Sequence, residues 1–234
     1  MFKSLTIVLP AYNEEENIEE AIRQARAVLD TLPFEETEIL VINDGSKDKT
    51  GEIIDRLEKE VPGLRALHQP SNMGYGAALR RGFTSARSDL IFYTDSDLQF
   101  DVREIKNFLP AIEDYDIVVG FRIYRYDPFS RLFLSWGYNL LMKLLFRARA
   151  RDIDCAFKLF RRSVFDKIKI RTDDFFVDAE VLSKAAYFKF GVTEIGVRHY
   201  PRKAGRSTIR PSHIFTTLKE LGKIWIEIYI EKKL

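Results

Sequence analysis

The sequence offers almost no basis for disulfide chemistry, because it contains a single cysteine, Cys155. One thiol cannot form an internal disulfide, which fits a reducing compartment. Cys155 falls in a strand-like apolar run, so we interpret it as a small buried residue. The three histidines lack the spacing of metal ligands, and this favours structural roles for them.

Long apolar runs are also missing. No window reaches the ~18 uninterrupted apolar residues that a membrane-spanning helix requires, and the nearest candidate, 132–146, contains Asn139 and Lys143. The first residues do not resemble a secretory signal, since their apolar run is short and Glu14 to Glu16 follow directly. We expect a cytoplasmic protein, either soluble or peripheral on the cytoplasmic face of a membrane.

An excess of charge of one sign is absent from the whole chain but present locally. The formal net charge is only +2, whereas residues 121–151 hold seven basic residues and one acid, Asp127. A second stretch, 197–211, holds five basic residues and no acid. Such runs are usually solvated faces, but two of them in one half, interleaved with aromatic residues, make that interpretation less favoured. Nucleic acid is not an expected partner, because no recognition motif appears.

Apolar runs and helical patterns alternate along the first half of the chain. This rhythm predicts an α/β fold with a Rossmann-like, mostly parallel central sheet and helices on both faces. We expect one domain over 1–234, with a nucleotide-binding half at 1–122 and an acceptor half at 123–234 packed on the same sheet. The predicted strands are 5–10, 37–43, 64–69, 89–94 and 116–122, and the predicted helices are 14–30, 49–60, 75–86 and 102–114.

Polar, turn-forming residues follow each of the first four predicted strands. Ligands of open α/β sheets bind at the carboxyl ends of the strands, so these ends predict a binding rim. A plainer alternative is that Asn13 and Asp44 cap the helices that follow them. A Walker phosphate loop is absent, and "GYGAAL" has Leu79 where a dinucleotide fingerprint needs its third glycine.

Paired carboxylates after the fourth strand suggest a cation. Asp95, Asp97 and Gln99 would point the same way if the strand continued extended. Carboxylate and amide oxygens suit Mg²⁺ or Mn²⁺, and such an ion would allow an acidic rim to accept a diphosphate. The sequence therefore predicts a divalent metal held by these three residues.

The motifs "IVLPAYNEEENI", "VINDGSKDKT", "NMGYGAALRRG" and "YTDSDLQF" together resemble the family 2 glycosyltransferases with the GT-A fold. The stretches "DIDCAFKLFRR" and "HYPRKAGRST" look like the polyprenol-phosphate sugar transferase branch, which includes the dolichol-phosphate mannose synthases. Thr208 stands where many relatives have lysine, so one phosphate contact of that motif departs from the pattern.

The resemblance implies roles for single residues. Asp44 would accept from the base, Asp95 would lie near ribose and metal, and the arginines would face phosphates. The implied donor site is Pro10, Tyr12, Glu14, Asp44 and Asp95; the metal site is Asp95, Asp97 and Gln99; the acceptor phosphate site is Arg122, Arg131, Arg202 and Ser207.

The expected function is inverting, metal-dependent transfer of a sugar from a nucleotide sugar to a polyprenyl or dolichyl phosphate, with mannose and GDP as the first choice and UDP next. Asp97 would act through the metal. Transfer to a soluble hydroxyl acceptor is an alternative, and it would need a general base. Asp178 and Glu180 are the candidates, although carboxylates at a helix start are common. A non-catalytic nucleotide-sugar-binding subunit is a third hypothesis.

Two apolar segments in the second half have more than one interpretation. The segment 132–146 is apolar around most of its helix, which is typical of a buried helix, while its arginine flanks also fit a lipid surface. Near the C-terminus one helical stripe favours core packing or self-association, with membrane contact as the alternative. That stripe is Ile214, Leu218, Leu221, Trp225 and Ile228.

Overall fold

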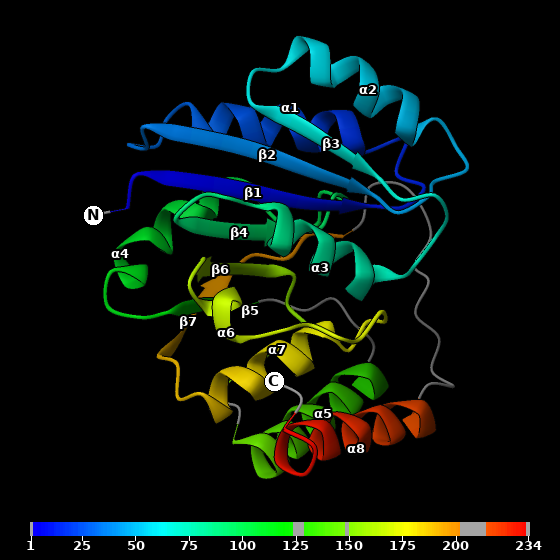
Figure 1. The fold of residues 1–234 in the computed structure, drawn as a ribbon, viewed down its shortest axis with the longest axis vertical. Coiled ribbons are helices and arrows are strands. Elements are labelled where there is room, and N and C mark those ends of the chain that lie inside the picture. Colours follow the sequence, from blue (N-terminus) through cyan, green and yellow to red (C-terminus); the bar gives the residue numbers. More distant parts are fainter. Residues whose placement is uncertain (1, 124–128, 148–149, 202–213, 233–234) are drawn as a thin grey trace.

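A computed structural model describes residues 2–123, 129–147, 150–201 and 214–232. Its centre is a seven-stranded sheet with the strand order β3-β2-β1-β4-β6-β5-β7 (Figure 1). Strands β6 and β7 come from the second half of the chain, so both halves build one sheet. The strands are β1 Ser4–Ala11, β2 Glu36–Asn43, β3 Leu64–His68, β4 Leu90–Thr94, β5 Ile117–Arg122, β6 Phe157–Arg161 and β7 Val192–Val197.

Strand β6 is antiparallel to both of its neighbours, β4 and β5, while the other paired strands run parallel. The prediction of a mostly parallel sheet is confirmed. The antiparallel register places Lys158 of β6 directly opposite Tyr93 of β4. A lysine is thereby carried into the middle of the sheet, where it needs a partner.

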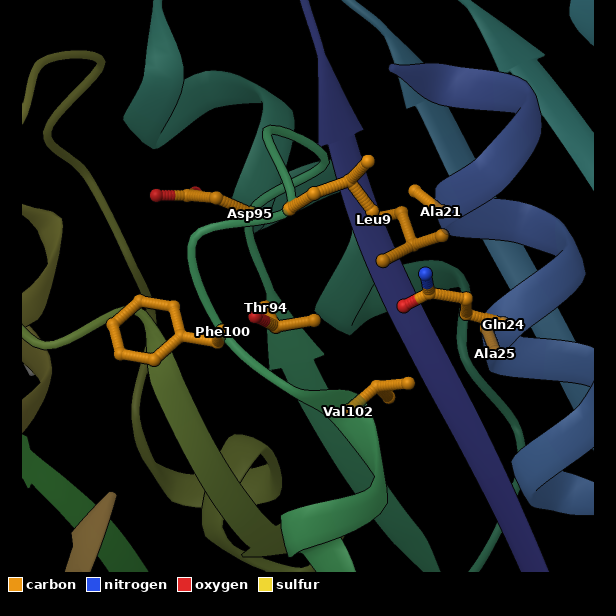
Figure 2. Close-up of a pocket in the computed structure, with 9 residues that line it drawn as sticks. Leu9, Ala21, Gln24, Ala25, Thr94, Asp95, Phe100 and Val102 are labelled. Carbon is orange, nitrogen blue, oxygen red and sulfur yellow. The ribbon is translucent and has the colours of Figure 1, made fainter. Parts of the chain in front are cut away.

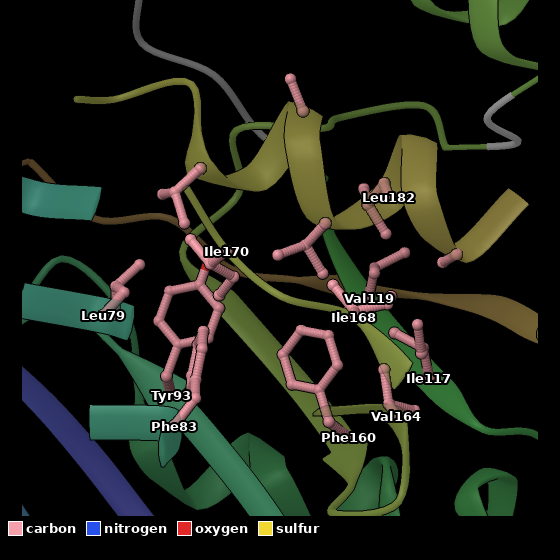
Figure 3. Close-up of a cluster of buried hydrophobic side chains, with 14 of the residues drawn as sticks. Leu79, Phe83, Tyr93, Ile117, Val119, Phe160, Val164, Ile168, Ile170 and Leu182 are labelled. Atoms are coloured by element: carbon pink, nitrogen blue, oxygen red, sulfur yellow. The ribbon is translucent and has the colours of Figure 1, made fainter. Parts of the chain in front are cut away.

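Helices cover both faces of the sheet, as the sequence predicted. Successive side chains of β1 alternate between two apolar clusters: Ile7 and Leu9 join the cluster under α1 and α2, and Val8 joins the other. Figure 3 shows this second cluster, in which Leu79, Phe83 and Leu182 pack on the sheet. The helices are α1 Ile18–Leu29, α2 Thr50–Glu60, α3 Tyr75–Ser85, η1 Val102–Asn107, α4 Leu109–Ile112, α5 Phe129–Phe146, α6 Val164–Lys167, α7 Val177–Tyr187 and α8 Ile214–Tyr229.

One predicted helix is divided. The segment 102–114 forms the 3₁₀ helix η1 and then the short helix α4, which has Pro110 in its first turn. Proline has no backbone N–H and is tolerated only in the first turn of a helix. A continuous helix across this position is therefore unfavourable.

Helices α5 and α8 lie side by side at one end of the molecule (Figure 1), where the rings of Phe146 and Tyr229 stack at 6.5 Å. Met142 and Phe146 of α5 are buried, whereas Trp136 is 61% and Leu144 69% exposed. Helix α5 is thus partly core and partly surface. None of the helices within the described residues combines the length and the apolar character needed to cross a bilayer.

The predicted C-terminal stripe is wrong at one position. In α8 the buried residues are Leu221, Ile224 and Ile228, while Trp225 is partly exposed. Positions 221, 224, 225 and 228 share the three- and four-residue spacing of one helical face, and Trp225 lies at the partly exposed edge of that face. The side chains of Ile214 and Leu218 lie outside the described part of the chain.

Candidate active site

The carboxyl ends of the first four strands meet at one edge of the sheet. Ala11 of β1 pairs with Asn43 of β2, and Asn43 pairs with His68 of β3. The Ser96 hydroxyl, just after β4, donates to the carbonyl of Pro10 at 2.7 Å. The rim that the sequence predicted is therefore assembled, and backbone contacts connect its segments.

The loop after β1 is fastened to the loop after β2. Asn13 adopts a left-handed conformation with φ of 55°, and its side chain accepts from the backbone N–H of Lys47 at 2.8 Å. Its own N–H donates to the Ser46 hydroxyl at 3.0 Å. The helix-capping alternative for Asn13 is wrong, because α1 begins at Ile18 and Asn13 instead joins two loops.

The other residues predicted to bind the donor lie at the end of β1 and in the loop after it. Pro10 is buried and Tyr12 is half-buried. The carboxylate of Glu14 accepts from the side-chain amide of Asn17 at 2.7 Å, which fixes the orientation of that carboxylate. These three residues therefore flank the rim on the β1 side.

Asp44 organises the loop after β3. Its carboxylate accepts from the Gln69 amide at 2.6 Å and from the backbone N–H groups of Met73 and Gly74 at 2.8 and 3.0 Å. Burial raises the pKa of Asp44, and these three donors partly offset the rise. The helix-capping alternative is wrong here too, since Asp44 binds another loop rather than α2.

Gly45 allows that loop to approach. Its φ is +66°, and a Cβ atom there would lie 2.2 Å from the carbonyl carbon of Ser71. Only glycine combines this conformation with this contact at little cost. The "NDGS" turn therefore brings the third strand's loop onto the rim.

The segment after β4 is bent rather than extended. Strand β4 ends at Thr94, residues 96–98 form a bend, and Leu98 has a positive φ of 60°. The expectation that Asp95, Asp97 and Gln99 continue an extended strand is wrong. Two contacts fix the bend: Ser96 is bound to the distant Pro10, and the Asp97 carboxylate accepts from the nearby Gln99 N–H at 3.2 Å.

The three predicted metal ligands nevertheless share one short turn. The Tyr75 hydroxyl donates to one oxygen of Asp95 at 2.8 Å, and burial together with the Asp95 charge raises the pKa of Tyr75, so the phenol stays protonated. Asp97 is only 4% exposed. The Gln99 amide donates to the carbonyl of Tyr200 at 3.1 Å, which orients that amide.

These residues fit a metal that arrives with its substrate. Among the residues that the structure describes, no three His, Cys, Asp or Glu side chains form a cluster able to hold an ion. Magnesium characteristically binds through one or two carboxylates plus substrate phosphates and water. Two carboxylates and one amide on the Asp95–Gln99 turn match that incomplete donor set.

A small pocket lies directly beneath this turn (Figure 2). Its lining includes Gln24 of α1, Leu9 of β1 and Phe100, beside Thr94 and Asp95. The Thr94 hydroxyl is buried and has no hydrogen-bond partner among the described residues. The pocket is far smaller than a nucleotide sugar, so a donor would lie on the open rim above it.

The second basic stretch begins beside the same turn. Phe100 and His199 form an antiparallel bridge, and the N–H of Tyr200 donates to the carbonyl of Gln99 at 2.8 Å. The predicted acceptor residues Arg202 and Ser207 follow, but both lie outside the described residues. Arg131 lies in α5, and its side chain is also outside the described part.

Arg122 has a partner that the sequence did not reveal. Its guanidinium forms two parallel hydrogen bonds with the Asp152 carboxylate, both at 2.7 Å. Burial alone lowers the pKa of Arg122, but Asp152 outweighs burial and raises it. This guanidinium is always charged, and Asp152 already occupies two of its five donors.

The candidate base Asp178 belongs to a buried ion pair. The Lys158 ammonium lies 2.8 Å from its carboxylate and also donates to the Tyr93 hydroxyl at 3.0 Å. The Tyr93 hydroxyl donates to Asp178, and burial raises the pKa of Tyr93 well above its ordinary value. Asp178, in the first turn of α7, therefore has one protein partner on β4 and one on β6.

Glu180 is fully engaged inside the protein. It accepts from the backbone N–H groups of Arg171 and Thr172 at 2.9–3.0 Å and pairs with the buried Lys184 at 2.7 Å. A carboxylate with these four contacts has no capacity to take a proton from a substrate. The geometry gives Glu180 a structural role, holding the loop before α7.

Asp154 is an ionisable residue that sequence reasoning did not single out. It is exposed, but the surrounding protein displaces water and the Asp178 charge lies close, so its pKa rises to about 7. Tyr138 of α5 hydrogen bonds to it. Its place in "DIDC", two residues after Asp152, was the one available signal.

The comparisons with known proteins agree on one protein family. The sequence profile described as "Glycosyl transferase family 2" matches residues 6–169. Glycosyltransferase AglD of Haloferax volcanii is 36% identical over 208 residues, which are 85% of this chain and 33% of that protein. Dolichyl-phosphate beta-glucosyltransferase ALG5C of Trichomonas vaginalis is 35% identical over 67% of this chain and 51% of its own length.

A third relative is the dodecaprenyl-phosphate galacturonate synthase of Rhizobium johnstonii, 29% identical over 93% of this chain and 65% of that protein. The chain thus spans between one third and two thirds of the length of these relatives. Among solved structures, glucosyl-3-phosphoglycerate synthase from Mycobacterium tuberculosis, in complex with Mn²⁺, UDP and glucosyl-3-phosphoglycerate, superposes with a TM-score of 0.65. That match has 19% identity and covers 97% of this chain and 77% of the other.

The structural likeness confirms the predicted GT-A fold, and the sequence similarity shows common descent with these relatives. The profile covers well over half of the chain and includes the loops after β1, β2, β3 and β4 that build the rim. The predicted resemblance is therefore confirmed: this chain belongs to glycosyl transferase family 2.

Proposed function

We propose that this protein transfers a sugar, with inversion, from a nucleotide sugar to a polyprenyl phosphate in a metal-dependent reaction. The observation that carries the proposal is the turn at the carboxyl end of β4. There Tyr75 fixes Asp95, and Asp97 and Gln99 lie on the same turn. Family membership and the polyprenyl-phosphate acceptors named in the relatives support it.

The donor is proposed to lie along the rim from β2 to β4. Pro10, Tyr12 and Glu14 would line the nucleoside site, and Asp44 would serve it both directly and through the loop it holds. The relatives named above transfer glucose and galacturonate, and related Salmonella proteins transfer 4-deoxy-4-formamido-L-arabinose. We therefore place glucose ahead of mannose as the sugar, and a UDP donor ahead of a GDP donor.

Asp95, Asp97 and Gln99 are proposed to hold Mg²⁺ or Mn²⁺. When bound, such an ion stabilises the charge that gathers on the departing diphosphate. The protein's own contribution is to keep Asp95 oriented through Tyr75 and the Gln99 amide oriented through Tyr200. Fixed ligands of this kind reduce the reorganisation that the reaction would otherwise require.

A phosphate acceptor is consistent with this site, because the candidate base carboxylates are already bonded to other protein groups. Transfer to a hydroxyl needs a general base, but Glu180 is saturated and Asp178 is paired with Lys158. A polyprenyl phosphate is already ionised at neutral pH and needs cations instead. We propose that the half from 123 onward supplies them through Arg131 and Arg202, that Ser207 adds a hydroxyl donor, and that Arg122 is fixed nearby by Asp152.

A donor panel tests the function. We expect UDP release from UDP-glucose to depend on added polyprenyl phosphate and divalent metal, with labelled sugar recovered in the organic phase. GDP-mannose and UDP-GlcNAc complete the panel. Label that stays in the aqueous phase on a glycan or small-molecule acceptor would contradict the lipid acceptor. Nucleotide binding without any turnover would instead indicate a non-catalytic subunit.

We also propose that α5 and α8 rest on the membrane that carries the acceptor. The exposed face of α5 presents Trp136, Leu140 and Leu144, together with the exposed cations Lys143 and Arg147. Helix α5 contains no acidic residue. An apolar face with basic residues and a tryptophan is typical of helices that lie in the interface of a bilayer.

Vesicle binding tests this surface. We expect co-sedimentation with anionic vesicles at low salt, and at least about tenfold weaker binding for Leu144→Ser, since burying a leucine contributes ~1.5–3 kcal/mol. The matched control is Tyr115→Ser, which also removes an exposed apolar side chain, in the turn before β5. Equal binding by both variants, or no sedimentation of the parent protein, would rule this surface out.

A further inference from the structure

An exposed aromatic ring stands beside the candidate metal turn. Phe175 is 53% exposed, and its ring stacks on Tyr75 with centroids 5.7 Å apart and an interplanar angle of 21°. The hydroxyl of Tyr75 in turn donates to Asp95 at 2.8 Å. One residue, Tyr75, therefore links the Phe175 ring to the carboxylate that is proposed to bind metal.

Side chains of α3 and α7 hold the loop that carries Phe175. Glu180 accepts from the backbone N–H groups of Arg171 and Thr172. Arg80 of α3 pairs with Asp173 at 2.7 Å and donates to the carbonyl of Thr172 at 3.3 Å. These contacts fix the backbone just before Phe175, so the exposed ring is presented by an ordered loop.

The backbone of the same loop packs against the start of α3. A Cβ atom on Gly74, whose φ is +100°, would lie 2.2 Å from the carbonyl oxygen of Asp173, and one on Gly76 would lie 2.6 Å from that of Thr172. Both glycines of "GYG" are thus required for close approach, with Tyr75 between them. The motif that resembled a dinucleotide fingerprint serves to seat the Phe175 loop beside Tyr75.

We infer that Phe175, backed by Tyr75, is the surface on which the sugar ring of the donor stacks, and that it is a specificity-determining residue. The inference rests on the proposed function. The sugar of the donor is bonded to the distal phosphate. A diphosphate held at the Asp95–Gln99 turn therefore places the sugar close to that turn. The electronegative face of an aromatic ring attracts the electropositive C–H groups of a pyranose.

The position of Phe175 favours the sugar over the nucleobase. Residues proposed for the nucleoside lie after β1 and β2, where Glu14 and Asp44 are fixed. Tyr75 lies directly at the candidate metal turn, where its hydroxyl donates to Asp95 at 2.8 Å. A sugar on Phe175 would therefore face the second half of the chain, from which the acceptor is proposed to approach.

The experiment compares a nucleotide with its sugar in the presence of Mn²⁺. Calorimetry would measure UDP and UDP-glucose, and GDP and GDP-mannose, with the parent protein, Phe175→Ala and Phe175→Trp. For the pair that binds, we expect Phe175→Ala to raise the dissociation constant of the nucleotide sugar about tenfold. The dissociation constant of the free nucleotide should change by less than about twofold. Phe175→Trp should restore most of the affinity, because it keeps an aromatic face.

Controls separate this role from a structural one. Tyr115→Ala removes another partly exposed aromatic residue, before β5, and should leave both affinities unchanged. Thermal unfolding would show whether Phe175→Ala remains folded. Equal loss for nucleotide and nucleotide sugar, loss confined to the KM for polyprenyl phosphate, or no loss in any of these constants would overturn the inference. A parent protein that binds none of the four compounds would reject the proposed function itself.

Discussion

Sugar transfer is expected to fall by about 10³-fold in Asp97→Asn, because the variant loses one of two carboxylates on the proposed metal turn. The fold should persist: the Asp97 side chain accepts from the Gln99 N–H, and the amide oxygen of asparagine can accept the same bond. Steady-state turnover with Mn²⁺ and Mg²⁺, together with thermal unfolding, would check both expectations.

Chelation provides an independent check on the same turn. Excess EDTA should abolish turnover of the parent protein, and added Mn²⁺ or Mg²⁺ should restore it. Asp166→Asn is the matched control, because Asp166 is an exposed carboxylate that pairs with Arg162 at the surface. Full activity in excess EDTA would remove the metal from the mechanism, and equal losses in the two variants would show that the effect is not specific to the turn.

The elements of the first half were predictable because their signals are local. Strands β1 to β5 appear as apolar runs, and helix α1 buries the residues that its spacing predicted, Ile18, Ile22 and Leu29 among them. The rim followed from these strands, since carboxyl ends of parallel strands share an edge. Periodicity and turn residues within short windows carry this information.

The chemistry of the rim was harder to predict because it depends on distant partners. Asp152 pairs with Arg122, and Glu180 holds the backbone of the loop before α7; neither partner is marked by local spacing. The bend after β4 depends on Ser96 reaching Pro10. Motif positions therefore indicated which residues gather at the rim, but not which of them are already occupied by other protein groups.

Lys158 illustrates this limit, because its sequence context is an ordinary apolar strand. The antiparallel register of β6 places it opposite Tyr93, beneath α7, with its side chain fully buried. It donates to the carbonyl of Cys155 at 2.7 Å and pairs with Asp178 at 2.8 Å. A buried ammonium needs such partners, so Asp178 has a structural reason to be a carboxylate.

Lys158→Met is accordingly expected to lower the free energy of unfolding by about 3–5 kcal/mol, since it leaves Asp178 buried and without its ionic partner. At ~2–4 °C per kcal/mol for a chain of this size, the unfolding midpoint should fall by roughly 10 °C. The double variant Lys158→Met with Asp178→Asn should recover part of the loss, because no unpaired charge remains. Lys223→Met, which breaks the exposed pair with Glu220, should change stability by less than ~1 kcal/mol.

The same series decides what Asp178 does. If its role is structural, Asp178→Asn should lower the unfolding midpoint while the folded fraction keeps a kcat close to that of the parent protein. If Asp178 is the general base, Asp178→Asn should abolish turnover with little change in stability, and the acceptor would then be a hydroxyl rather than a phosphate. The ion pair with Lys158 and the hydrogen bond from Tyr93 favour the first outcome, because both groups already occupy the Asp178 carboxylate inside the protein.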